Sequence, residues 1–317
     1  AAAQTRRYHY NRRVRVNIYW NAKDSFFAAT DNMSVKINAG HPFITKTKGR
    51  ENRYQIILGV FTHELGHILY TDFLAAQTHA NYLGSYKWFP YPPVLTTSAD
   101  ARREKEFWEY VKEDAKNLEM VQYISGYISN IIDDGYVENR MLANFPGKLA
   151  YGLEELREIH FEEVPTVTRL EETEDRHIFE SIAQIMLSYA KFGEIKYGDE
   201  PLSDKRIQVV FSLINDIDTA LMSRSGKERL GVVNTIMVRC WDYLQDFCEE
   251  CKKRQEEAEA AGGTSSIAQT LSEVLQSIAG GSTAGTGSSS PVPEGKGESD
   301  ESATAGARAK THEDAED

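Results

Sequence analysis

The sequence is poor in cysteine, poor in positive charge, and has no long apolar segment. Only three of its 317 residues are cysteine, and Cys240, Cys248 and Cys251 fall close together in a helical pattern. This is poor material for a disulfide framework, and a single Cys-x-x-Cys pair is weak evidence for zinc. We therefore expect reduced thiols on a helix.

Positive charge is in the minority. The chain has 36 lysine and arginine residues against 48 acidic residues, and its net charge is −12. Because such a chain repels a phosphate backbone, we expect no nucleic-acid partner. The one basic cluster is interleaved with tyrosine and histidine, a pattern that the solvent face of a strand also has. It consists of Arg6, Arg7, Arg12, Arg13 and Arg15.

Long apolar runs are missing as well. No segment reaches the roughly eighteen residues that span a bilayer, and the first residues lack the apolar core of a signal peptide. We therefore expect no membrane association and a cytoplasmic location. The chain begins with alanine instead of methionine and ends in an acidic stretch, from which we expect a processed product or a fragment of a longer protein.

The most informative stretch is the sequence His-Glu-Leu-Gly-His at positions 63–67. On a helix, His63 and His67 are four residues apart, so both imidazoles share one face and can hold one metal ion. Glu64 then lies beside the metal without being a ligand. From there its carboxylate can take a proton from a metal-bound water.

Apolar residues surround this motif on most sides of the predicted helix, which is typical of a buried helix. Buried ionisable groups are costly unless they are paired or bound to metal. The setting therefore favours a metal site over structural histidines in a core. The metal that we expect is Zn²⁺.

Two histidines do not complete a catalytic zinc site, which usually has three protein ligands and a water. A third histidine in the extended pattern His-Glu-x-x-His-x-x-Gly-x-x-His is excluded, because positions 70 and 73 are Tyr70 and Phe73. The candidates are acids of a second predicted helix, Asp133, Asp134 and Glu138.

The acids at 134 and 138 are helical neighbours, and like charges at that spacing destabilise a plain helix. A cation or a hydrogen-bonded histidine would explain them. The alternative is an ordinary acidic surface stripe, but the apolar residues that flank the cluster indicate that part of it faces inward.

We expect an α+β fold that is mostly α. Alternation of apolar and polar residues predicts strands at 13–20 and 33–38, which would form a small antiparallel sheet. The proline-rich segment 79–97 is predicted to be a loop. Helical patterns follow, with a break expected near Gly126 in the first of them, at 98–144, 174–189, 203–222 and 227–259.

Composition divides the chain into three parts. Residues 1–261 form the predicted domain. Residues 262–279 are a linker with a short amphipathic helix, which could dock onto a partner or back onto the domain. Residues 280–317 are rich in Gly, Ser, Thr, Ala and acidic residues, so we expect this tail to be disordered.

The stretches FTHELGHILYTDF at 61–73 and IIDDGYVENR at 131–140, with the acidic tail, resemble a group of bacterial and mobile-element metallopeptidase-like proteins. Members of that group join a zincin domain, which carries a His-Glu-x-x-His helix, to a von Willebrand factor A-type domain. Relatives include accessory proteins of cobaltochelatase and of nitric oxide reductase activation. The A-type domain, with its Asp-x-Ser-x-Ser motif, does not occur in this sequence.

The resemblance implies a zincin-like fold and a ligand set. In zincins that take the third ligand from a second helix, an acid or amide four residues further on often supports a ligating histidine. On that basis we favour Asp134 as the third ligand and Glu138 as its support. The reverse assignment and Asp133 stay open.

Together these patterns predict a zinc-dependent peptidase acting on a protein or peptide substrate. Glu64 would be the general base for attack of the metal-activated water on a peptide carbonyl. Some donor must also stabilise the oxyanion. The candidates are Tyr136 and His177, with Tyr123, Tyr127 and His160.

The alternative is a non-catalytic zinc-binding assembly or adaptor module. Such a module would work with a partner such as an AAA+ ATPase or a von Willebrand A-type domain. The amphipathic segment and the tail after residue 262 would recruit that partner.

Overall fold

The computed structural model describes residues 14–23, 26–31, 33–172, 176–199, 201–260 and 266–278. Within these ranges the protein is mostly helical and has a small three-stranded sheet, so the predicted α+β class with a majority of helix is confirmed. The predicted disordered tail lies outside the described residues, as do Arg6, Arg7, Arg12 and Arg13 of the basic cluster.

The sheet contains β1 (Arg15–Tyr19), β2 (Ala28–Thr30) and β3 (Ser34–Asn38) in the order β1-β3-β2. The expectation of a purely antiparallel sheet was wrong: β2 is antiparallel to β3, but β1 is parallel to it. The reason is the turn at Asp31, whose side chain accepts hydrogen bonds from the backbone N–H groups of Met33 and Ser34. That turn makes β2 the antiparallel partner of β3, and β1 pairs with the other edge of β3.

The helices follow the sheet along the chain. They are α2 (Pro42–Thr45), α3 (Arg50–Tyr70), α4 (Phe73–Gly84), α5 (Ser98–Glu113), α6 (Ala115–Asn144), α7 (Lys148–Glu163), α8 (Val167–Glu172), α9 (Ile178–Phe192), α10 (Lys205–Met222), α11 (Gly226–Arg239), α12 (Trp241–Ala260) and α13 (Ile267–Ile278).

Several helix boundaries in the structure differ from the predicted ones. The loop predicted from residue 79 begins only after α4 ends at Gly84. The break expected near Gly126 lies at Asp114, whose side chain accepts from the N–H of Lys116 and so caps α6. The helix predicted at 227–259 is divided at Cys240 into α11 and α12.

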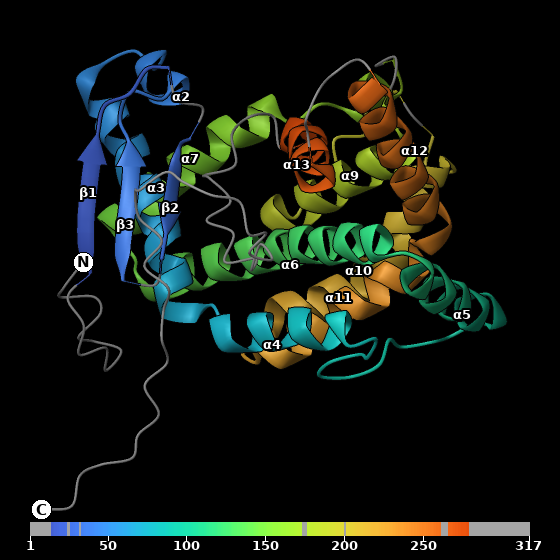
Figure 1. Cartoon of the computed structure of the whole chain (residues 1–317). Coiled ribbons are helices and arrows are strands. Elements are labelled where there is room, and N and C mark those ends of the chain that lie inside the picture. The colour runs from blue at the N-terminus through green and yellow to red at the C-terminus, as the bar shows by residue number, and fades with distance from the viewer. Residues whose placement is uncertain are drawn as a thin grey trace, which may run out of the picture.

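Figure 1 shows the sheet at one end of the molecule and the long α6 running through its middle. Apart from the short α2, which lies next to the sheet, the other helices are separated from the sheet by α3 and α7. Helices α4, α10 and α11 pack along one side of α6. The amphipathic α13 docks back onto α6, α9 and α12, burying Ile267, Leu271 and Leu275. Among the described residues, no helix has the length and apolar character that crossing a membrane requires.

The apolar interior forms two clusters, and α6 contributes to both. We call the first the sheet core; it joins β2 and β3 to α3 and α7, through residues such as Val35, Ile37, Val60, Leu65, Met141 and Leu156. We call the second the helical core. It brings together α5, α6 and the helices from α9 through α13, through residues such as Phe107, Ile124, Ile128, Phe179, Trp241 and Phe247. All three cysteines are free and buried in the helical core.

Helices α3 and α7 touch at a pair of glycines. A Cβ atom placed on Gly59 would lie 2.2 Å from the carbonyl oxygen of Gly152 and 2.8 Å from the Cβ atom of Leu156. A Cβ on Gly152 would meet the backbone of α3 at 3.0 Å. The backbone of α3, and with it the predicted metal motif, is therefore positioned by the absence of side chains at this crossing.

We expect Gly59→Ala to lower the free energy of unfolding by about 1–3 kcal/mol, because the two helices must separate to admit the methyl group. Urea unfolding measures this loss. The matched control is Gly84→Ala, whose Cβ would meet only the end of the flexible Gln122 side chain, which can move by giving up its hydrogen bond to the Ala80 carbonyl. That control should lose no more than about 1 kcal/mol, the contribution of one hydrogen bond, and an equal loss in both variants would contradict the packing argument.

Candidate metal centre

Three potential ligands from two helices converge at the crossing of α3 and α6. His63 and His67 come from α3, and Asp134 comes from α6. The two Nε2 atoms are 3.2 Å apart, and Asp134 Oδ1 lies 3.2 Å from Nε2 of His67 and 3.8 Å from Nε2 of His63. These three residues form a group that could bind a metal ion.

The local sequence explains why the helices come so close. Gly66 lies between the histidines, and a Cβ there would be 3.0 Å from Met141 Cγ and 3.3 Å from Val137 Cβ. With no side chain at Gly66, α6 can approach within reach of both imidazoles. His63 is 1% exposed, whereas the side chains of His67 and Asp134 are 17% and 14% exposed. Solvent therefore reaches the group from the side of His67 and Asp134.

Each histidine is oriented through its other ring nitrogen. His63 Nδ1 lies 2.9 Å from Glu138 Oε1, and His67 Nδ1 lies 2.9 Å from the hydroxyl oxygen of Thr71. That hydroxyl donates a short hydrogen bond to Asp133 Oδ2. Each Nδ1 can therefore donate its proton to that partner, which leaves Nε2 of a neutral imidazole available to a metal ion.

Glu138 is completely buried and is neutralised by two cations from other helices. Lys191 Nζ of α9 lies 3.0 Å from Oε1, and an Arg157 guanidinium nitrogen of α7 lies 2.7 Å from Oε2. Asp133 is neutralised in the same way by Arg229 of α11, at 2.9 Å. The two acids that orient the histidines thus have their charge balanced from within the protein.

Asp134 differs from its neighbours in this respect. Within the described residues, its only ionic contacts are with His63 and His67, and it has no lysine or arginine partner. A carboxylate that is mostly removed from water needs a positive charge close by. Here that charge has to come from a protonated histidine or from a bound cation.

The acidity of these groups agrees with this arrangement. Burial acts to raise the pKa of Glu138, but Lys191 and His63 hold it well below its usual range. Burial also acts to lower the pKa of His67, yet its contacts with Asp133 and Asp134 raise it well above its usual value. The position between the histidines and Asp134 is therefore one where the protein stabilises a cation.

Glu64 is 1% exposed and stands beside the two histidines on α3. Its Oε1 atom is buried and has no hydrogen-bond partner among the described residues. Burial raises the pKa of Glu64 to about 7, and the histidines act against this increase. An orphaned buried carboxylate oxygen next to three potential ligands is what a site prepared for a metal and a water would contain.

The oxyanion candidates lie in different places. Tyr136 packs its ring under the Arg229 guanidinium, 3.8 Å from the ring centre, and faces Tyr70. His177 caps α9 by accepting from the Phe179 N–H. The contacts found for these two side chains do not include any of the three potential ligands.

Tyr127 and His160 are closer to the site electrostatically. Tyr127 is 8% exposed, its hydroxyl has no partner among the described residues, and its pKa is raised by burial and by the charge of Asp134. The pKa of His160 is held well below its usual value by burial and by Lys191. Tyr123 is partly buried against the helical core.

Sequence reasoning missed the cations and the hydroxyl that complete the site. Thr71 follows His67 by one helical turn, so helical spacing could have identified it. Lys191 ends an otherwise apolar face of α9, and a lysine in that setting signals a buried partner. For Arg157 and Arg229 we find no local signal.

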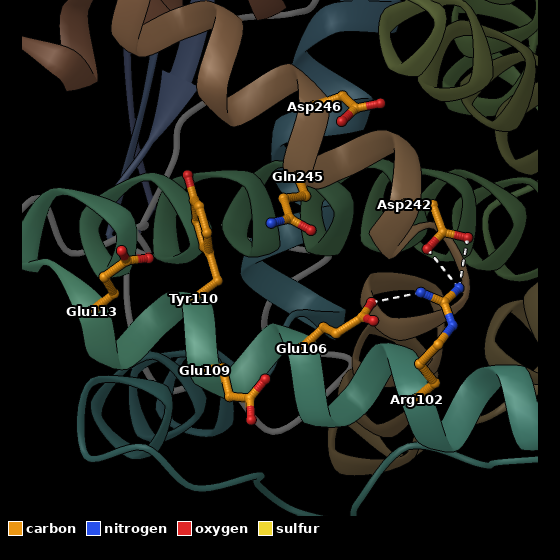
Figure 2. A pocket seen from close by; sticks show the side chains of 8 residues that line it. All are labelled: Arg102, Glu106, Glu109, Tyr110, Glu113, Asp242, Gln245 and Asp246. Atoms are coloured by element: carbon orange, nitrogen blue, oxygen red, sulfur yellow. Dashed lines mark hydrogen bonds and ion pairs between the residues drawn. The ribbon is translucent and has the colours of Figure 1, made fainter.

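A large cavity lies elsewhere in the described part of the chain. It is a groove of about 690 Å³ between α5 and α12, and Figure 2 shows Arg102 bonded to Glu106 and Asp242 within it. The remaining lining is mainly acidic. A much smaller cavity of about 40 Å³ adjoins the metal centre and is bordered by Thr71, Asp133 and Arg229. Of these two cavities, the smaller one is lined by residues that orient a histidine.

Comparison with known proteins does not identify a relative. No protein-family description matches the chain, and neither the curated proteins nor the solved structures include a match. The functional argument therefore depends on the geometry of the site.

We expect Asp134→Asn to weaken zinc binding far more than Asp133→Asn does. The first change removes a ligand, whereas the second removes a group that orients His67 and should cost about 10–100-fold in affinity. Competition with a chromophoric chelator measures both affinities, and thermal unfolding checks that each variant folds. The opposite order of affinities would rule out Asp134 as the third ligand.

We expect Glu138→Ala to lower the free energy of unfolding by about 3–5 kcal/mol, because it leaves Lys191 and Arg157 without their carboxylate in the interior. Replacing Lys191 by Met in the same chain should restore part of that loss, since one uncompensated charge disappears. Denaturant unfolding of the single and double variants measures the coupling. Additive losses would show that the buried pair does not contribute as described.

Proposed function

We propose that the protein is a zinc-dependent hydrolase that cleaves peptide bonds. The observation that carries the proposal is the unbalanced charge of Asp134 beside two histidines whose Nε2 atoms face it. The acids before and after it on α6, Asp133 and Glu138, are paired with internal cations. Asp134 has no such partner among the described residues, and it lies where three potential donor atoms meet.

The donor set and its spacing support zinc. Two imidazoles and one carboxylate are a common ligand set of catalytic zinc, which keeps a further position open. Zinc bonds of 2.0–2.1 Å in a tetrahedron separate the ligand atoms by about 3.3 Å. The separations found here are 3.2, 3.2 and 3.8 Å. His63, His67 and Asp134 could therefore hold the ion with only a small adjustment.

A zinc ion held there would act as a Lewis acid and lower the pKa of a bound water to about 7. Of the protein's own residues, Glu64 would transfer the proton. Its unpartnered Oε1 can accept a proton from the attacking water and return it to the leaving amine. The raised pKa suits proton exchange near neutral pH, although a divalent cation beside Glu64 would lower that value.

For the developing negative charge on the substrate carbonyl we propose Tyr127 as the donor. Tyr127 precedes Asp134 by two helical turns and lies on the same face of α6. Its hydroxyl is buried, lacks a partner among the described residues and keeps its proton, because burial and Asp134 raise its pKa. A protonated donor that is electrostatically coupled to Asp134 fits this role better than Tyr136 or His177.

The choice of peptide bonds as substrate rests on the resemblance of the 63–67 motif and the 131–140 acids to zincins. The adaptor alternative shares the zinc site but not the turnover. It assigned partner recruitment to the amphipathic segment at 264–279 and to the tail, and in the structure Ile267, Leu271 and Leu275 of that segment are buried against the rest of the protein. We therefore keep the hydrolase as the leading proposal.

Glu64→Gln should keep zinc and lose activity. The amide preserves the size of the side chain but cannot accept the proton, so hydrolysis of a broad peptide library should fall by about 10²–10⁴-fold at unchanged metal content. Mass spectrometry of the digest and elemental analysis measure the two quantities. The matched control, Glu51→Gln, makes the same change at an exposed position of α3 and should leave both unchanged.

Full activity in Glu64→Gln would refute the role of Glu64 as general base. A wild-type protein that binds zinc stoichiometrically but cleaves no member of the library would favour the adaptor instead.

A further inference from the structure

The outer strand of the sheet leaves an apolar stripe in solvent. Within the described residues β1 is the edge of the sheet, and Figure 1 shows it on the side away from the helices that surround α6. Val16, Ile18 and Trp20 are 40%, 57% and 67% exposed. Large apolar side chains at alternate positions of an edge strand are unusual in a monomer, because such an edge can pair with another chain.

The stripe belongs to the face of the sheet that elsewhere forms the sheet core. Val16 is aligned with Val35 of β3 and Ile18 with Ile37, so their side chains point to the same side of the sheet. Val35 and Ile37 are fully buried against α3. Helix α3 packs on β2 and β3, and β1 extends beyond its cover. A surface outside these elements is therefore needed to shield the apolar stripe of β1.

The backbone of β1 also has groups that can pair. The N–H of Arg15 donates to the C=O of Met33, and the C=O of Tyr19 accepts from the N–H of Ala39. These two residues flank β3, so the bonds fix which backbone groups of β1 point towards that strand. The backbone groups of Arg15, Asn17 and Tyr19 therefore point to β3, and those of Val16 and Ile18 point to the free edge. A strand added there would be bonded through Val16 and Ile18.

We propose that a second copy of this chain occupies the edge, with its β1 antiparallel to the first about a two-fold axis at Asn17. In this register Val16 lies opposite Ile18 of the other copy, and their outward N–H and C=O groups bond to each other. Arg15 lies opposite Tyr19, a cation beside an aromatic ring. The result is a symmetric dimer with one continuous sheet.

The extent of pairing and the charge of Arg15 favour this register. Moving the axis to Arg15 would place the two arginines directly opposite each other, and like charges at that position are destabilising. Moving it to Tyr19 would leave Val16 without a partner strand. The axis at Asn17 is the one that pairs the whole of β1 with itself and places no like charges opposite. An unrelated strand would have no such reason to match β1.

The two copies of Asn17 face each other across the axis as a non-hydrogen-bonded pair, with Cα atoms about 4.5 Å apart. This separation lies within the range of a disulfide, so Asn17→Cys should form a covalent dimer under mild oxidation. The control is Arg15→Cys on the same face of β1. Its two copies would be separated by about four residues of strand, or roughly 13 Å, which is too far for a disulfide.

The native cysteines are all buried, so the wild type should give no cross-link and provides the baseline. Non-reducing electrophoresis across a series of protein concentrations measures the covalent dimer. Rapid and selective cross-linking of Asn17→Cys supports the proposal. Equal cross-linking at both positions, or none at either, overturns it.

A second measurement needs no cysteine. Sedimentation equilibrium of the wild type should show the average mass rising from 35.8 kDa towards twice that value with concentration. Ile18→Lys places a charge in the proposed interface and should keep the protein monomeric, while its far-UV circular dichroism spectrum and zinc content stay unchanged. The control Met222→Lys alters an apolar side chain that is 85% exposed on α10 and should leave the association intact.

A wild type that stays monomeric at all concentrations overturns the proposal and indicates that another segment or another protein covers β1. A dimer that persists in Ile18→Lys overturns it as well, because that dimer would use a different surface.

Discussion

Glu138 is the residue through which the four helices around the metal centre depend on one another. It belongs to α6 and contacts His63 of α3, Arg157 of α7 and Lys191 of α9. Because it is fully buried, each of these contacts must be made for its charge to be tolerated. The packing of α3 on α7 through paired glycines and the docking of α9 on α6 are the conditions under which they are made.

The three acids of α6 differ in their roles because they differ in their cationic partners. Asp133 and Glu138 face opposite sides of the histidine pair and receive cations from neighbouring helices. Each can therefore hold an imidazole in one tautomer without competing for a metal. Asp134, between them in sequence, has no such cation among the described residues and stays available as a potential metal ligand.

The part of the site that follows helical spacing could be predicted from the sequence, because His63, Glu64 and His67 share a helix and Asp134 and Glu138 share another. The choice among the acids could not, since it depends on Arg157, Lys191 and Arg229, which reach the site from three other helices. The same limit applies to the fold. Strands β1 and β3 and most helices followed from local patterns. The parallel pairing of β1 depended on a short strand, β2, that alternation did not reveal.

The division of the interior into two clusters has a consequence for local stability. His63 and His67 belong to a helix of the sheet core, whereas α6, which carries Asp134, spans both clusters. Cooperative units of unequal stability can open separately, and a fluctuation that releases α3 from α6 would scatter the ligands while the helical core stayed folded. The lifetime of the assembled ligand set is then governed by the less stable of the two clusters, and a bound ion would lengthen it by linking them.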